Sequence, residues 1–144
     1  MGIDALTSGE LDMTCTAALT VAGQVRCLVE FRLVEWGLAR LVDDVRLIAG
    51  ELVANAVRAA PGREVRVRFA REQGAVLLGV WDSAGEMPRT RPVVELTLEA
   101  LDLDPGNFDN NGGWGLPVVE ALASECGVLR TEPYGKWVWA RLRA

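Results

Sequence analysis

The chain has 144 residues, of which 50% are apolar and 24% are charged, a composition typical of one globular domain rather than of a collagen-like, coiled-coil or disordered protein. Its formal net charge of −5 repels a phosphate backbone, so we expect no nucleic-acid partner. The absence of histidine excludes Ser-His triads, histidine metal ligands and phosphohistidine chemistry. Any catalytic base must therefore be a carboxylate, a lysine, a cysteine or a tyrosine.

The cysteines and the N-terminus indicate the cellular compartment. The three cysteines are odd in number, widely spaced and form no CxxC pair, so we expect buried thiols rather than a disulfide framework or a zinc site. No apolar run approaches the ~20 residues that a membrane span needs, and residues 1–4 lack the basic region of a secretory signal. These features predict a single cytoplasmic domain over residues 1–144, without a membrane partner.

The first predicted elements are a strand and two helices. Alternation of apolar and polar residues predicts a short strand over residues 11–15, after a disordered segment over residues 1–10. Apolar residues at helical spacing predict a helix over residues 21–36 and a second one over residues 41–60, where Pro61-Gly62 follows. The apolar face of the second helix is formed by Leu41, Val45, Ile48, Leu52 and Ala56.

A β-hairpin and a long irregular segment come next. Two strands over residues 65–69 and 75–81 form the hairpin. The segment that follows is rich in proline, glycine and asparagine, which is typical of a functional lid. We place this lid at about residues 83–114, with a short helix over residues 93–101.

The last part of the chain predicts a helix over residues 115–124 and strands over residues 128–131 and 136–142. Together with the earlier elements, this order predicts an α/β (α+β) two-layer sandwich. A mixed β-sheet would carry the helices on one of its faces.

Two polar residues interrupt the second helix where its neighbours are apolar. Glu51 and Asn55 lie four residues apart, so they share one face of the helix, where a carboxylate and an amide need partners. A carboxylate with an amide carbonyl suits Mg²⁺, which keeps several waters and takes further oxygens from phosphates. The alternative is a boundary pair that faces solvent.

Two further features have nucleotide-binding chemistry. Residues 112–116 place glycines directly before a helical pattern, where backbone amides and a positive helix terminus suit phosphate oxygens; a loop whose glycines only cap and turn is the alternative. Asp82 ends an apolar strand, where its carboxylate can accept a hydrogen bond from an exocyclic amine, or can simply open a turn.

Taken in order, these segments resemble the GHKL-type ATPase domain of gyrase, histidine kinases and MutL, which has the Bergerat-type ATP-binding fold. The closest resemblance is to small bacterial anti-sigma-factor serine/threonine kinases and related actinobacterial ATP-binding regulators. Residues 50–58 resemble the family's Glu-x-x-x-Asn helix, residues 80–83 its adenine-binding strand end, and residues 113–119 its Gly-x-Gly-Leu motif. Residues 135–140 resemble the closing strand of actinobacterial members.

The resemblance implies ATP and Mg²⁺ as cofactors. It implies that Glu51 acts as the general base, Asn55 coordinates Mg²⁺, and Asp82 binds the adenine amino group. Phosphate and nucleotide contacts are implied for the residues that match the glycine motifs: Gly85, Gly113, Gly115 and Leu116. In the kinase branch the acceptor is a serine of a small anti-anti-sigma protein, so the implied partners are that protein or a sigma factor, besides ATP and ADP. A homodimer is also implied.

The chain departs from the family pattern at the adenine end. Gly85 is the only glycine in residues 83–86, where relatives often have Gly-x-Gly. Trp137 stands where many relatives have a small hydroxyl residue beside the adenine-binding aspartate, so the indole stacks on the base, turns away or fills the pocket. Two functions follow from this comparison: an ATP-dependent serine/threonine kinase of anti-sigma type, or a non-catalytic module for partner switching.

Overall fold

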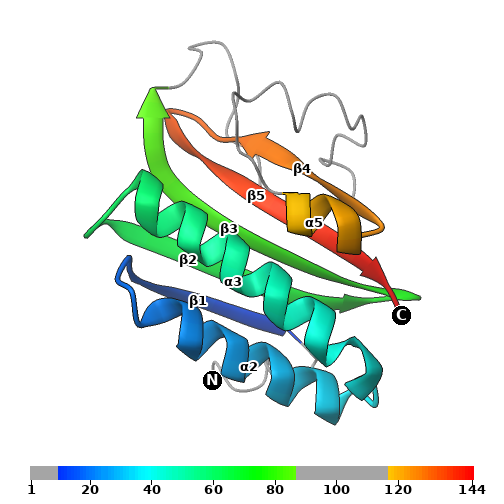
Figure 1. The fold of residues 1–144 in the computed structure, drawn as a ribbon. Helices are drawn as coiled ribbons and strands as arrows, with labels where there is room; N and C mark the ends of the chain where they lie inside the picture. The colour runs from blue at the N-terminus through cyan, green and yellow to red at the C-terminus, as the bar shows by residue number, and fades with distance from the viewer. Residues whose placement is uncertain (1–9, 87–116) are drawn as a thin grey trace.

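The computed structural model describes residues 10–86 and 117–144. Figure 1 shows the helices packed on a curved sheet. None of the described helices combines the length and the apolar character needed to cross a membrane. The elements in chain order are β1 (Glu10–Thr16), α2 (Val21–Glu35), η1 (Ala39–Leu41), α3 (Val42–Ala59), β2 (Glu64–Glu72), β3 (Ala75–Glu86), α5 (Pro117–Leu122), β4 (Glu125–Arg130) and β5 (Tyr134–Arg143).

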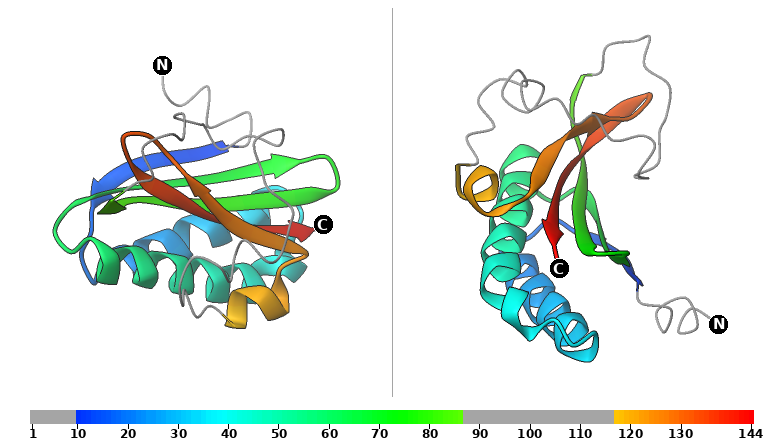
Figure 2. Two further views of the ribbon diagram at one scale, coloured as in Figure 1. Left: turned by 90° about the horizontal axis from the view of Figure 1, so that it is seen from above. Right: turned by 90° about the vertical axis from the view of Figure 1, so that its right-hand side faces the viewer.

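The strands form one sheet in the order β1-β2-β3-β5-β4. Both views of Figure 2 place α2 and α3 on the same side of this sheet, which confirms the predicted two-layer sandwich. The sheet is not mixed as expected, because each neighbouring pair of described strands is antiparallel. Short turns join β2 to β3 and β4 to β5, and a short turn can connect only antiparallel neighbours.

Helix α3 is the central element of the helical layer. It begins after the turn η1, and Asp43 and Asp44 in its first turn interact favourably with the positive end of the helix. It ends at Ala59, shortly before Pro61, which cannot continue a helix. The apolar residues on its inner face are each at most 1% exposed: Val45, Ile48, Leu52 and Ala56.

The main core lies between the two layers. Helix α2 contributes a buried stripe at helical spacing, formed by Val21, Val25, Val29 and Leu33. The sheet contributes the inward side chains of alternate residues, among them Val67, Phe69, Val80 and Val138. A second apolar cluster lies on the opposite face of the sheet and contains Leu77, Trp81, Leu129, Trp137 and Trp139.

Some predicted boundaries differ from the observed ones. Strand β3 continues to Glu86, so residues 83–86 of the predicted lid are strand. Residue 10, predicted as disordered, begins β1. The rest of the predicted lid, its helix over residues 93–101 and the segment over residues 1–9 lie outside the described residues.

Candidate functional site

The two polar residues of α3 lie one turn apart but in different environments. Asn55 is 8% exposed, and its Nδ2 is buried without a hydrogen-bond partner among the described residues. Glu51 is half-buried. The two side chains thus share a flank of α3, as predicted, with the carboxylate nearer to solvent.

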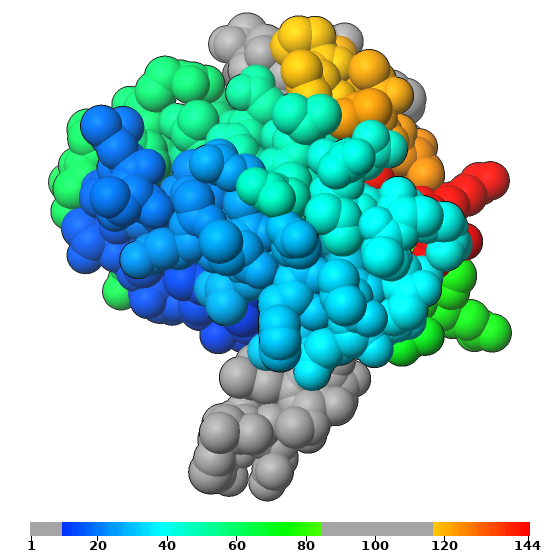
Figure 3. Space-filling model, turned by 60° about the horizontal axis from the view of Figure 1, so that its bottom comes forward, coloured from blue at the N-terminus to red at the C-terminus, as the bar shows by residue number. Residues whose placement is uncertain are grey.

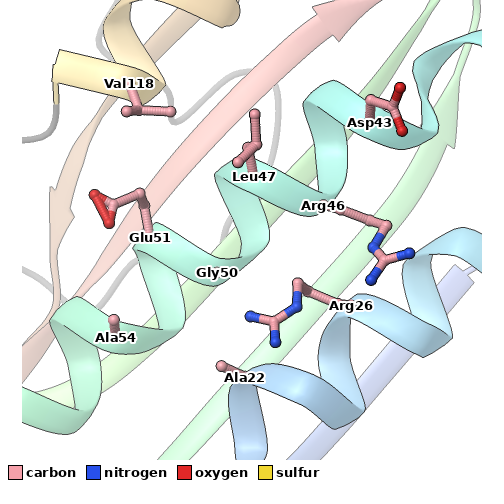
Figure 4. Close-up of a pocket in the computed structure, with 9 residues that line it drawn as sticks. All are labelled: Ala22, Arg26, Asp43, Arg46, Leu47, Gly50, Glu51, Ala54 and Val118. Carbon is pink, nitrogen blue, oxygen red and sulfur yellow. The ribbon is translucent and has the colours of Figure 1, made fainter.

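Glu51 lines a groove of about 800 Å³ on the outer side of the helical layer. Figure 3 shows the face of the molecule that α2 and α3 form, with α5 beside them. In Figure 4, Glu51 points toward Val118 of α5, and Arg26 and Arg46 lie on the other side of α3. The groove therefore has Glu51 on its α5 side and a basic wall, formed by Arg26 and Arg46, on its α2 side; Asp43 is a second carboxylate in its lining.

The basic wall depends on a glycine in α3. A Cβ at Gly50 would lie 3.2 Å from Nη1 of Arg26, so the absence of a side chain lets this guanidinium lie close against α3. Arg46 is held by an ion pair with Glu30, at 2.8 Å between Nη1 and Oε1. Glu51 makes no ion pair within residues 10–86 and 117–144. Its carboxylate is therefore available to a ligand or to an incoming hydroxyl.

Asp82 lies on β3 in the sheet layer and is fully buried. Its Oδ1 accepts hydrogen bonds from Nζ of Lys136 at 2.6 Å and from the backbone N–H of Ala84 at 2.9 Å. Its Oδ2 is buried and has no partner among the described residues. The Asp82 carboxylate thus keeps one oxygen that can accept a hydrogen bond from a ligand.

Lys136 is the partner that the sequence analysis did not identify. Burial lowers the pKa of its ammonium group, and the hydrogen bond and negative charge of Asp82 oppose this shift. The signal was present in the sequence. Lys136 stands two and four residues before Val138 and Ala140, so its side chain lies on the same face of the strand as these core residues. From the sequence, Trp137 is expected at the position beside Asp82 instead.

Trp137 turns away from the site. It pairs with Trp81 across β3 and β5, and both side chains lie on the face of the sheet opposite the helices. The guanidinium of Arg66 lies over its ring, 5.5 Å from the centroid. Of the three expected positions of this indole, the structure has the one that turns away from the face of the sheet on which Asp82 lies.

Another hollow, of about 570 Å³, is lined in part by residues that are close to Asp82 and Lys136 in the sequence. Its lining includes Ser83, Ala84 and Tyr134, which flank the pair on β3 and β5, and residues 59–61 at the end of α3. Gly85 continues β3 beyond this hollow. The other predicted phosphate-contacting residues, Gly113, Gly115 and Leu116, lie outside the described residues.

The donor atoms suit Mg²⁺ held together with a nucleotide rather than a metal held by protein alone. Residues 10–86 and 117–144 contain no group of three or more cysteine, aspartate or glutamate side chains that could form a metal site. Mg²⁺ commonly takes only one or two protein ligands, with phosphate oxygens and water completing its shell. The side-chain oxygen Oδ1 of Asn55 fits this role beside Glu51, whereas its unsatisfied Nδ2 is a donor that suits a phosphate oxygen.

Comparisons with known proteins agree with this fold. The model of the histidine kinase-like ATPase domain matches residues 16–142. The structure is similar to the crystal structure of the RsbU and RsbW domains of Rv1364c from Mycobacterium tuberculosis, with a TM-score of 0.56 and 21% sequence identity. The match covers 93% of this chain and 31% of that chain, so this chain corresponds to about a third of it.

No curated protein sequence matches the chain. The family match spans most of the residues and includes the helix with Glu51 and Asn55 and the strand that ends at Asp82. Membership supports ATP binding. This chain belongs to the histidine kinase-like ATPase domain family.

Proposed function

We propose that the chain is a cytoplasmic, Mg-ATP-binding regulator that acts as a serine/threonine kinase of anti-sigma type on a small anti-anti-sigma protein. The observation that carries the proposal is the pair of buried polar atoms without partners, Asn55 Nδ2 on α3 and Asp82 Oδ2 on β3. An unsatisfied buried polar group costs about 1–3 kcal/mol. A ligand that satisfies both groups would remove that cost.

Each predicted residue has a specific role in this function. Asp82 would accept a hydrogen bond from the adenine amino group, and Oδ1 of Asn55 would hold Mg²⁺ while its Nδ2 donates to a phosphate oxygen. When bound, Mg²⁺ neutralises charge on the phosphates. Glu51 would accept the proton of the attacking serine hydroxyl, which requires a carboxylate free of ion pairs. Gly85, Gly113, Gly115 and Leu116 would contact the nucleotide through the backbone.

A non-catalytic partner-switching module is the second candidate. It is favoured by the reduced glycine motif after Asp82, because Gly85 is the only glycine in residues 83–86, where relatives often have Gly-x-Gly. Such a module would keep the fold and bind the same partner proteins without phosphoryl transfer. ATP binding and phosphoryl transfer therefore need separate experiments.

The binding experiment is calorimetric titration of Mg-ATP into the wild type, Asn55→Ala and Asp82→Asn. Hydrogen bonds to charged groups contribute about 1.5–3 kcal/mol, so we expect Kd to rise roughly 10- to 150-fold for Asp82→Asn. Asn55→Ala should weaken binding of Mg-ATP more than binding of ATP in EDTA. Absence of binding to the wild type at millimolar Mg-ATP would refute the proposal.

The kinase experiment follows transfer of the labelled γ-phosphoryl group to candidate serine-bearing partner proteins. Glu51→Gln keeps the shape of the side chain and removes the base, so we expect the transfer rate to fall about 10²- to 10⁴-fold with Mg-ATP affinity retained. Transfer at the wild-type rate by Glu51→Gln would exclude Glu51 as the base. If the wild type binds Mg-ATP and its partner but transfers no label, the non-catalytic module is the correct function.

A further inference from the structure

Lys136 is the only lysine in the chain, and the other 14 basic side chains are arginines. It is also buried, with 4% of its surface exposed. Lysine is almost never fully buried unless it is paired, and its partner here is Asp82, directly opposite on β3. Lys136 thus places the only lysine ammonium of the chain next to a buried carboxylate.

The Asp12–Arg66 pair shows what an arginine does to a carboxylate in this sheet. Nε of Arg66 donates to Oδ1 of Asp12 at 3.0 Å, and Nη2 donates to Oδ2 at 2.9 Å, so both oxygens are occupied. The ammonium of Lys136 occupies only Oδ1 of Asp82 and leaves Oδ2 without a partner among the described residues. This difference follows from the planar fork of a guanidinium and the point charge of an ammonium.

The pair therefore presents a hydrogen-bond acceptor next to a charged donor. The Ala84 N–H and Lys136 both bind Oδ1, which fixes the carboxyl group and leaves Oδ2 as the acceptor. Adenine presents the complementary pattern on one edge, where the N6 amine is a donor and ring nitrogen N1 is an acceptor. An exocyclic amine alone needs only the carboxylate, so the ammonium supplies a second point of contact.

We propose that Lys136 is a specificity-determining residue that donates a hydrogen bond to N1 of adenine while Asp82 Oδ2 accepts one from the N6 amine. This inference rests on the proposed ATP-binding function. Residues that flank the pair line the hollow of about 570 Å³, a volume within the range of small-molecule sites.

The test compares ATP with 1-deaza-ATP, which keeps the N6 amine and lacks N1. We expect the wild type to bind 1-deaza-ATP roughly 10- to 150-fold more weakly, the effect of a lost hydrogen bond to a charged group. In Lys136→Met the two affinities should agree within about twofold, because the donor to N1 is absent. Arg143→Met, which removes an exposed cation from the same strand, should keep the wild-type ratio.

A second variant and a spectroscopic measurement cover the case in which Lys136→Met does not fold. Lys136→Arg keeps the positive charge, and its guanidinium should take both oxygens of Asp82, so the folded variant should bind ATP at least tenfold more weakly. Selective ¹⁵N-lysine labelling gives a single side-chain Nζ signal, since the chain has one lysine. ATP should shift this signal, and 1-deaza-ATP at saturation should shift it much less.

The outcomes separate this inference from the proposed function. A wild type that binds ATP and 1-deaza-ATP equally well would refute the role of Lys136 and leave ATP binding intact. The same conclusion would follow if Lys136→Met kept the wild-type ratio, or if Lys136→Arg bound ATP as tightly as the wild type. A wild type that binds no ATP would refute the proposed function itself.

Discussion

Lys136 and Trp137 are neighbours in the sequence and lie on opposite faces of β5. Lys136 contacts Asp82 on the helix side, and Trp137 packs with Trp81 on the other side. Successive side chains of a strand point to opposite faces, so a shift of one position exchanges the residue beside Asp82. The resemblance to known ATPases predicts the large side chain of Trp137 at the position beside Asp82. In the structure, the charged side chain of Lys136 occupies that place.

Gly135 controls the approach of β5 to Trp81. Its φ of +93° disfavours any residue with a side chain, and a Cβ there would lie 2.5 Å from Cζ2 of Trp81 and 2.8 Å from the carbonyl oxygen of Asp82. We expect Gly135→Ala to lower the free energy of unfolding by roughly 2–4 kcal/mol, from backbone strain and overlap together. The measurement is urea denaturation followed by circular dichroism.

Gly62→Ala is the matched control for this prediction. Gly62 has a φ of +73°, but no atom lies within 4 Å of a Cβ built there, so only backbone strain applies. We expect a loss of roughly 1–2 kcal/mol for this variant. Equal losses in the two variants would contradict the steric role of Trp81 and Asp82 at Gly135.

At the scale of elements, β1 is an edge strand attached to the sheet through β2 alone among the described strands. Inward residues such as Leu11 pack against the core, and outward residues form ion pairs with β2. Asp12 binds Arg66 through both oxygens, and Glu10 binds Arg68 at 2.8 Å. These pairs fix the register of an edge strand, where charged side chains also discourage pairing with another chain.

The Asp12–Arg66 pair predicts a pH dependence of stability. The hydrogen bond from Arg66 lowers the pKa of Asp12 below its ordinary value of 3.8. A carboxylate with a lowered folded-state pKa stabilises the fold above its unfolded-state pKa, and the contribution is lost as the pH falls through the folded-state pKa. We therefore expect Asp12→Asn to be less stable than the wild type at pH 7 and equally stable at a pH below the folded-state pKa.

Urea denaturation of both proteins between pH 7 and pH 2 measures this difference. Added salt should reduce it at pH 7, because the pair is partly exposed and ions screen it. A difference between the two proteins that stays constant over the whole pH range would show that the carboxylate charge of Asp12 does not stabilise the edge strand.

At the scale of the whole molecule, the proposed site takes residues from both layers. Glu51 and Asn55 come from the helical layer, and Asp82 and Lys136 come from the sheet. The helix-facing core packs the two layers together, while a separate tryptophan-rich cluster occupies the other face of the sheet. Because the site residues are anchored in rigid elements, their relative positions depend on the packing between the layers.

The sequence by itself determined the helices, the hairpin, the two-layer architecture and the family. Apolar residues recur with the helical period in residues 21–36 and 41–60 and with the period of a strand in residues 65–69, and these periods are local properties of the chain. The Glu-x-x-x-Asn spacing of Glu51 and Asn55 is also local, which is why both were predicted on a shared flank of one helix.

Only the tertiary structure decided the pairing of strands and the surroundings of Asp82. Asp82 and Lys136 are 54 residues apart, and they meet because β5 aligns antiparallel to β3 in one register. The sequence also could not show that Arg26 lies against Gly50, since this contact depends on how α2 packs on α3. Such long-range contacts depend on packing between elements, and no local pattern in the sequence specifies that packing.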